Sequence, residues 1–340
     1  MTVAHDLEAH RVALTGHCYR MLGSVTKAED AVQETLLRAW RGLGGFDGRA
    51  SLRTWLTRIA THVCLDALHH GRRRARPIEE GPAGTVDDAL VPEAHTRWIE
   101  PAPAALLVPA DDDPARRAAL RQSVRLAFVA ALQHLPARQR AALLLADVLE
   151  WPAADVAEVL GLTVAALNSA LQRARATLAA RGIAAETLDS DALSARDAEL
   201  LERFVSLFER YDIDALAALC REDVAFSMPP FALWLQGPEA VAAWLGGRGA
   251  ACRGSRVVRV AAGDATAYAQ YKRDGAASYK AWGLGVLECE AGQIVRWTTF
   301  LDVATLFPRF GLALHLAGDG AEENRTAADE SAPAGQSVPA

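Results

Sequence analysis

Residues 153–175, AADVAEVLGLTVAALNSALQRAR, carry the most informative local pattern in the chain. A helix-turn-helix needs a small residue where its helices cross, a turn residue that tolerates positive φ, and an apolar anchor on the second helix. Ala157, Gly161 and Leu167 stand at this spacing. The stretch therefore predicts two short helices joined by a tight turn. An ordinary helical hairpin with a solvated second helix is the alternative.

The same spacing leaves one face of the second helix largely polar. Such a face offers hydrogen-bond donors to base edges in a major groove or to phosphates. Because the opposite face holds the apolar anchors, we expect these side chains to be exposed. The residues expected on this face are Thr163, Ala166, Asn168, Ser169, Gln172, Arg173 and Arg175.

The net charge of −6 conceals a division along the chain. Residues 1–74 hold 11 basic against 7 acidic residues, and residues 116–181 hold 9 against 4. Between them, residues 75–115 hold 2 basic against 9 acidic residues. Positive charge gathered on one domain attracts nucleic-acid phosphates. The pattern indicates two nucleic-acid-facing domains joined by an acidic connector.

Length and composition limit the remaining possibilities. The 340 residues suffice for two or three domains, and a hydrophobic fraction of 51% excludes disorder along the whole chain. No apolar run reaches the ~18 residues of a membrane-spanning helix. The cysteines, which lack CxxC spacing, are Cys18, Cys64, Cys220, Cys252 and Cys289. We therefore expect no metal site, no membrane segment and a reducing, cytoplasmic location.

Hydrophobic periodicity predicts helices in both basic segments. A first apolar stripe ends at Gly23, and Ser24 or Thr26 caps the next helix. Ser51 caps a third helix, predicted to run through the arginine cluster to residue 76. Residues 77–113 are rich in proline and acidic residues, which indicates an extended linker. Helices resume with one predicted over residues 114–132.

The last part of the chain has a different period. A helix near residues 195–220 is followed by partly alternating segments, which predict strands of a curved antiparallel sheet. These segments are 223–228, 255–263, 265–273, 278–290 and 292–302. The end of the chain, 317–340, is acidic and polar, and we expect it to be disordered.

Four stretches together resemble the two domains of the extracytoplasmic-function (ECF) sigma factors, the small class of sigma-70 RNA polymerase subunits. They are AEDAVQETLLRAW (28–40), FDGRASLRTWLTRIATHVCLDALHHGRRR (46–74), LPARQRAALLLADVLEWPAADVAEVLGL (135–162) and LNSALQRARATL (167–178). The resemblance implies a region 2 domain at 1–76, a linker at 77–115 and a helix-turn-helix region 4 domain at 116–182.

The resemblance also implies roles for individual residues. A helix carrying Asp30, Gln33, Glu34 and Arg38 would grip the clamp helices of the polymerase β′ subunit; a solvated helix face with surface pairs is the alternative. The residues implied at the −10 element of the promoter are Phe46, Asp47, Arg49, Ser51, Arg53, Thr54, Arg58, His62, His69 and Arg72. The helix from Thr163 would read the −35 element.

The acidic linker gains a meaning from the same resemblance. In this family it threads the positively charged channels of the polymerase, including its β subunit, where acids imitate a nucleic-acid backbone. A soluble tether is the plainer interpretation. Within it, RWIEP (Arg97–Pro101) is similar to a linker motif that docks on an additional C-terminal domain.

Residues 196–316 resemble that additional domain, a SnoaL-like α+β cone of the NTF2-like type. Such a cone can hold a small apolar ligand in its interior, or its aromatic side chains can simply form a core. The candidate pocket residues are Met228, Phe231, Trp234, Trp244, Tyr271, Trp282, Trp297, Phe300 and Asp302. The fold class expected is thus two all-α domains that bind DNA and polymerase, followed by an α+β cone.

The function implied is promoter recognition and initiation of transcription, modulated by the cone domain. Core RNA polymerase and promoter DNA are the implied partners, together with a small ligand or an anti-sigma protein. No catalytic residue, cofactor or metal is expected. One rival is a cyclase or isomerase with a DNA-binding appendage, which would need a buried acid/base pair such as Asp302 with Asp212 or Asp214. A conventional helix-turn-helix repressor is the second rival, and it would leave residues 26–76 unexplained.

Overall fold

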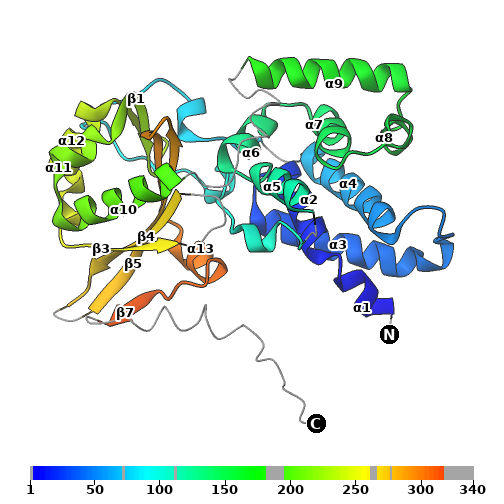
Figure 1. The fold of residues 1–340 in the computed structure, drawn as a ribbon, viewed down its shortest axis with the longest axis horizontal. Helices are drawn as coiled ribbons and strands as arrows, with labels where there is room; N and C mark the ends of the chain where they lie inside the picture. The colour runs from blue at the N-terminus through cyan, green and yellow to red at the C-terminus, as the bar shows by residue number, and fades with distance from the viewer. Residues whose placement is uncertain are drawn as a thin grey trace, which may run out of the picture.

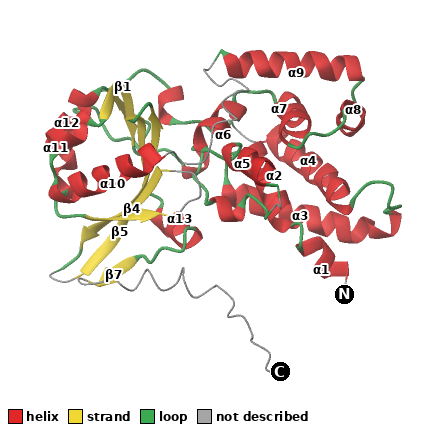
Figure 2. Cartoon of the chain, in the orientation of Figure 1, coloured by secondary structure: helices red, strands yellow, loops and turns green. Residues whose placement is uncertain are grey.

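The computed structural model describes residues 3–70, 73–110, 113–180, 195–260, 266–275 and 278–317. Helices fill its N-terminal half, and a sheet with further helices forms the C-terminal part (Figure 1). In Figure 2 the yellow strands gather on one side of the molecule and most of the red helices on the other. Two helical units and one α+β unit were predicted, and this fold class is confirmed. Almost all of the predicted acidic tail, from residue 318 on, lies outside the described residues.

The first helical unit is a bundle whose breaks follow from its caps. Its elements are α1 (Val3–Glu8), α2 (Arg11–Leu22), α3 (Val25–Gly42), the 3₁₀ turn η1 (Leu43–Gly45) and α4 (Leu52–His70). Gly23 ends α2 in the left-handed conformation with φ of 67°. The Ser24 hydroxyl then accepts a hydrogen bond from the Lys27 amide and begins α3. The prediction of a third helix reaching residue 76 is wrong, because from Arg73 the described chain turns into the linker.

The linker lies against its neighbours instead of extending freely. Its described residues form the 3₁₀ turns η2 (Pro77–Glu79), η3 (His95–Arg97) and η4 (Ala104–Leu106). Ala75 pairs in parallel with Trp98, and Pro92 pairs in antiparallel with Phe231 of the C-terminal unit. The carbonyl of Leu107 approaches α2 so closely that a Cβ on Gly16 would collide with it. The linker is therefore in contact with the first helical unit and with the C-terminal unit.

The second helical unit contains the predicted helix-turn-helix. Its elements are α5 (Pro114–Gln122), α6 (Leu126–Gln133), α7 (Ala137–Leu143), the π-helical turn η5 (Leu144–Val148), α8 (Ala153–Leu160) and α9 (Val164–Ala179). Gly161 ends α8 with φ of 61°, and α9 turns by 94° relative to α8. The helix predicted over 114–132 is broken after Gln122, where the Ser123 hydroxyl donates to the Leu120 carbonyl.

Two buried arginines join the helical units to each other. Arg140 of α7 donates hydrogen bonds to the carbonyls of Met21 in α2 and Gln133 in α6. Arg20 of α2 donates to the Ser123 hydroxyl at 3.0 Å. Burial lowers the pKa of both guanidinium groups to about 10. The hydrogen bonds of these two guanidinium groups thus go to neutral oxygen atoms.

The C-terminal unit combines helices with a seven-stranded sheet. Its helices are α10 (Ala195–Arg210), α11 (Ile213–Ala218), α12 (Pro238–Gly246), the 3₁₀ turn η7 (Arg248–Cys252) and α13 (Val303–Arg309). Its strands are β1 (Cys220–Ser227), β2 (Trp234–Gln236), β3 (Arg256–Val260), β4 (Thr266–Arg273), β5 (Ser278–Glu290), β6 (Gln293–Phe300) and β7 (His315–Ala317).

The sheet is mixed, and the prediction of a purely antiparallel sheet is wrong. Its strand order is β2-β1-β6-β5-β4-β3, with β7 paired to β5. All these pairs are antiparallel except β1 with β6, which are parallel. The long connection from β1 through α12 and the four strands β2 to β5 returns β6 beside β1 in the same direction.

The interior of the cone is filled with aromatic side chains. Phe204 of α10 packs edge-on against Trp297 with 4.9 Å between ring centroids. The Trp297 indole donates to the Tyr268 hydroxyl at 2.6 Å. A Cβ on Gly285 would collide with the Tyr268 ring, so glycine there makes room for this packing. The concave face of the sheet is therefore a core.

We predict that Trp297→Ala destabilises the C-terminal unit by about 3–5 kcal/mol, because it opens a cavity in this core. Urea unfolding followed by tyrosine and tryptophan fluorescence measures the loss. The control is Trp282→Ala, since 38% of the Trp282 surface is exposed while that of Trp297 is 1%. Equal effects of the two changes would contradict the assignment of Trp297 to the core.

Candidate nucleic-acid interface

Helix α9 presents its predicted polar face to solvent. Thr163 is its N-cap, and the Thr163 hydroxyl accepts a hydrogen bond from the Ala166 amide. Leu167, Ala170, Leu171 and Ala174 form the buried side of the helix. The exposed residues include all seven that were predicted, namely Thr163, Ala166, Asn168, Ser169, Gln172, Arg173 and Arg175. The structure thus places all seven on the exposed side of one helix segment, where a groove of DNA has access to them.

The two arginines of α9 differ in their surroundings. Arg175 forms a bidentate ion pair with Asp147 of η5, with N–O distances of 2.9 and 2.7 Å. This pair raises the pKa of Arg175, chiefly through its hydrogen bonds to Asp147. Arg173 is exposed on the outer face. Arg175 is therefore oriented by its own unit, whereas Arg173 points to solvent.

A second polar surface follows α4 and the loop before it. Ser51 begins the helix by accepting from the Thr54 amide at 3.1 Å, and its hydroxyl also bonds to that of Thr54. The exposed residues among those predicted here are Asp47, Arg49, Ser51, His62 and His69. The half-buried ones are Phe46, Arg53, Thr54 and Arg58. Arg72, the remaining member of the predicted set, lies outside the described residues.

The loop before α4 pairs an aromatic residue with a polar edge. The rings of Phe46 and Trp55 lie 5.2 Å apart at an interplanar angle of 40°. Asp47 accepts from both the amide and the guanidinium of Arg49. Gly48 takes φ of 73°, which a residue with a side chain rarely adopts. The loop therefore carries an aromatic surface beside a fixed carboxylate.

An ion pair connects the α4 surface to the helix-turn-helix. Arg58 of α4 donates to Glu158 of α8 at 3.2 Å, across two helical units that also contact each other through α4 and α7. The Arg58 side chain is 29% exposed. In this arrangement one of the predicted DNA-contacting arginines is engaged by the helix-turn-helix itself.

The outer face of α3 carries the predicted polymerase-binding side chains. Glu34 accepts from Arg38 at 2.6 Å, and Arg38 also reaches Asp66 of α4 at 3.4 Å. Asp30 pairs with Lys27 at 3.2 Å, and Gln33 is exposed. These four residues therefore share one accessible helix face.

Two apolar residues on α3 escaped the sequence analysis. Leu37 is 42% exposed and Trp40 is 65% exposed, beside the charged residues just described. An exposed tryptophan among charges is typical of a protein-binding surface. The sequence could have revealed their exposure, because both residues lie off the buried stripe of α3 that contains Val32, Thr35 and Ala39.

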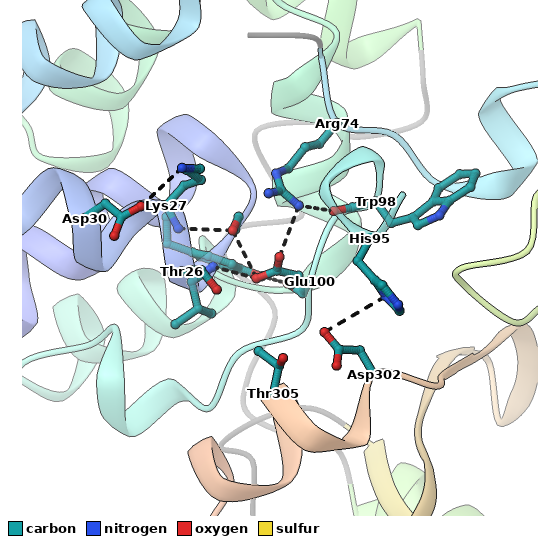
Figure 3. A network of polar contacts seen from close by, with 12 residues as sticks. Thr26, Lys27, Asp30, Arg74, His95, Trp98, Glu100, Asp302 and Thr305 are labelled. Atoms are coloured by element: carbon teal, nitrogen blue, oxygen red, sulfur yellow. Dashed lines mark hydrogen bonds and ion pairs between the residues drawn. The ribbon is translucent and has the colours of Figure 1, made fainter. Parts of the chain in front are cut away.

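Glu100 of the linker is the centre of a polar network at the start of α3 (Figure 3). Its carboxylate accepts hydrogen bonds from the Ser24 hydroxyl at 3.0 Å and from the Val25 amide at 3.1 Å. The same carboxylate pairs with Arg74 at 3.1 Å, and its backbone carbonyl accepts from the Tyr19 hydroxyl at 2.7 Å. The predicted motif thus binds the first helical unit.

The motif also docks on the C-terminal unit, as was predicted. Trp98 is 2% exposed, and its indole donates to the Pro230 carbonyl at 3.1 Å. The Trp234 indole in turn donates to the Gly81 carbonyl of the linker at 3.0 Å. We call residues 97–101 the linker clasp, because they join the first helical unit to the C-terminal unit.

The nine candidate pocket residues do not surround one cavity. Trp297, Trp244 and Met228 belong to the packed interior of the cone or lie against it. Tyr271 and Phe300 lie in the core on the other face of the sheet, where Tyr271 packs against Phe307 of α13 at 5.3 Å.

The other four lie at the periphery of the unit. Trp234 bonds to the linker as described, and Phe231 pairs with Pro92 of the linker. Trp282 is exposed and stacks beneath the Lys272 ammonium, which lies 3.2 Å from its ring centroid. Asp302 lies 4.0 Å from the His95 imidazole of the linker (Figure 3). These positions indicate docking and core packing for most members of the set.

The acid/base pair that an isomerase would need is not formed by the predicted carboxylates. Asp302 is 32% exposed and faces the linker outside the cone. Asp212 caps α11 by accepting from the Ala215 amide at 3.2 Å, and Asp214 lies in the first turn of that helix. The described residues contain no cluster of three or more potential metal ligands, and none of their single helices has the length and apolar composition for a membrane span.

Known families match all three units. The model of Sigma-70 region 2 matches residues 7–74, that of Sigma-70 region 4 matches residues 125–178, and the SnoaL-like domain matches residues 201–297. The chain is 45% identical over 310 residues to the ECF RNA polymerase sigma factor SigG of Mycobacterium tuberculosis, covering 90% of this chain and 82% of that protein.

Two further comparisons concern SigJ of the same organism. The ECF RNA polymerase sigma factor SigJ is 30% identical over 223 residues, which cover 65% of this chain and 63% of that protein. Its crystal structure superimposes with a TM-score of 0.57 at 21% identity, over 92% of this chain and 100% of that chain. The three units therefore share the fold of that protein.

The identity to SigG extends across both helical units and the C-terminal unit, which sets aside the enzyme and the repressor as alternatives. The chain belongs to the ECF RNA polymerase sigma factors, those with a SnoaL-like C-terminal domain, and it directs core polymerase to promoters and is not an enzyme.

Proposed function

We propose a division of labour along the chain. Residues 1–76 bind core polymerase and capture the −10 element, residues 116–182 bind the −35 element, and residues 196–316 modulate both through the linker at 77–115. The observation that carries this proposal is the linker clasp, which bonds to the first helical unit and to the C-terminal unit at once. Its place of action is the cytoplasm, where polymerase and promoter DNA meet.

The seven exposed residues of α9 are proposed to bind the −35 element. A recognition helix reads bases through amide side chains and is positioned by arginines on phosphates. Asn168 and Gln172 are amides, and Arg173 points to solvent. Arg175, oriented by Asp147, is suited to a phosphate at a fixed place.

The loop and helix of the first unit are proposed to hold the −10 element as a single strand. An extruded base needs an aromatic surface and a polar group at its edge. Phe46 with Trp55 supplies the first, and Asp47, fixed by Arg49, supplies the second. The remaining residues of this set, from Ser51 to His69, would follow the strand along α4.

The outer face of α3 is proposed to bind the clamp helices of the polymerase β′ subunit. Asp30, Gln33, Glu34 and Arg38 offer charged and polar contacts, and Leu37 and Trp40 add apolar area among them. Such a mixture of an aromatic anchor and a polar surround is typical of an energetically important contact. The acidic linker is proposed to lie along the β subunit once it is released.

The closed arrangement is proposed to restrain the factor. Arg309 of α13 donates to Thr26 and Glu29 at the start of α3, both at 3.0 Å. Arg58 is held by Glu158 of α8, so the α4 surface is attached to the helix-turn-helix. We propose that loosening these contacts raises promoter output, because both surfaces can then adjust to the polymerase.

Arg173→Ala should weaken binding of the holoenzyme to promoters by about three- to tenfold. The slope of the logarithm of the binding constant against the logarithm of salt concentration should fall by about one, because one phosphate contact is lost. Filter binding at several salt concentrations measures both. Arg210→Ala, which alters an exposed arginine of α10, is the matched control. Unchanged affinity and salt dependence for Arg173→Ala would contradict the assignment of α9.

Trp40→Ala should lower the affinity for core polymerase by about tenfold or more, because exposed tryptophans commonly anchor interfaces. Its effect on the free energy of unfolding should stay within about 0.5 kcal/mol, since the residue is a surface one. A pull-down with purified core polymerase measures the first effect, with Trp282→Ala as the control. Full retention of binding would exclude this part of α3 from the interface.

Glu100→Ala should loosen the linker clasp and raise run-off transcription, since Ser24, Val25 and Arg74 lose their shared acceptor. Proteolysis within the linker should become faster as well, because its attachment to the first unit is weakened. Glu93→Ala removes an ion pair with Arg97 in the same linker and is the control. If Glu100→Ala left both cleavage and transcription as in the control, the clasp would not restrain the factor.

A further inference from the structure

A cavity of about 820 Å³ lies where the three units of the chain meet. Its volume falls within the range of about 300–1,000 Å³ that is common for small-molecule sites. The sheet contributes residues such as Val286 and Val295, the linker contributes Ile78, and the second helical unit contributes Leu126 of α6 and Val124 between α5 and α6. The cavity adjoins the β4–β6 part of the sheet, whereas none of the nine residues considered for the cone interior lines it.

The cavity is lined by arginines from the linker, the second helical unit and the sheet. They are Arg73, Arg76, Arg121, Arg125 and Arg296. The acidic residues that line it are Glu79, Asp197, Glu288 and Glu290, and His134 is also present. The five arginines exceed the four acidic residues by one, which favours a ligand with a single negative charge.

Some of these charged side chains already form ion pairs with each other. Glu79 pairs with Arg76 at 3.1 Å, and Glu288 pairs with Arg296 at 3.0 Å. The Nε donors of Arg125 and Arg296 are buried and have no hydrogen-bond partner. A buried donor without an acceptor costs about 1–3 kcal/mol. Arg125, the N-cap residue of α6, and Arg296 of β6 both line the cavity, so their guanidinium groups keep hydrogen-bonding capacity that the surrounding residues do not use.

Most of the other lining residues are apolar, with Tyr19 and Thr266 as polar members. Ile78, Val124, Val286, Val295 and Phe310 lie among the charged residues around the same space. A fully hydrated inorganic ion makes no use of such walls, whereas an alkyl chain is stabilised by contact with them. The combination suits a molecule with an anionic head and an apolar body.

We propose that this junction cavity binds a small amphipathic monoanion, an alkyl or acyl chain that ends in a carboxylate or a phosphate. Arg125 and Arg296 are the residues that would receive the anionic head, and the valines and Phe310 would contact the chain. Because its walls include Tyr19 of α2 as well as residues of the linker, α5, α6 and the sheet, a ligand there contacts every unit that the closed arrangement holds together. Binding is measured directly on the full chain, so this inference stands or falls separately from the promoter assignments.

Isothermal titration of the full-length protein with octanoate, monooctyl phosphate, 1-octanol and inorganic phosphate tests the proposal. At least one of the two amphipathic anions should bind with a Kd below about 1 mM, and at least tenfold more tightly than octanol or inorganic phosphate. Preference between octanoate and octyl phosphate identifies the head group. Absence of binding by both anions up to about 10 mM, or equal binding of octanol or of inorganic phosphate, would overturn the proposal.

Variants locate the binding. Arg125→Gln should weaken binding of the preferred anion by about tenfold, the loss expected for one charge-assisted hydrogen bond. Arg210→Gln, on the exposed face of α10, should leave binding unchanged. Ala127→Phe keeps every charge and fills part of the cavity from α6, so it should also reduce binding at least about tenfold. Circular dichroism and melting confirm that each variant is folded, and unaltered affinity in both Arg125→Gln and Ala127→Phe would contradict binding at this place.

Discussion

The carboxylate of Glu100 is the contact on which the arrangement of the molecule depends. It accepts hydrogen bonds from the first residues of α3 and pairs with the buried guanidinium of Arg74, while the neighbouring Trp98 bonds to the C-terminal unit. A charged acceptor with several donors is worth more than neutral contacts, and its loss leaves buried donors unpaired. Two side chains of a proline-rich linker, Glu100 and Trp98, thus join the first helical unit to the C-terminal unit.

Local patterns predicted the parts of the molecule that depend on short-range rules. The positions of Ala157, Gly161 and Leu167 predicted α8, the left-handed turn and the buried side of α9, since helix periodicity and the φ of a turn glycine are local properties. The strand at 278–290 was predicted with its observed limits for the same reason. The exposed face of α9 followed from this periodicity residue by residue.

Contacts between distant segments were beyond these rules. The parallel pairing of β1 with β6 joins strands that are far apart in the chain, and no local signal distinguishes it from antiparallel pairing. The candidate pocket set mixed two faces of one sheet: Trp297 and Phe300 on β6 are three residues apart and therefore point to opposite sides. Alternation could have separated these two, whereas the path of the linker and the junction cavity required the folded chain.

The buried arginines between the helical units bear on how this protein comes apart. Arg20 and Arg140 direct their hydrogen bonds to neutral oxygens, so their charges gain less inside the interface than they would from carboxylates. When the units separate, both guanidinium groups regain full hydration, which offsets part of the apolar area newly exposed to water. The contact between the helical units is therefore less cohesive than one in which these two charges met carboxylates.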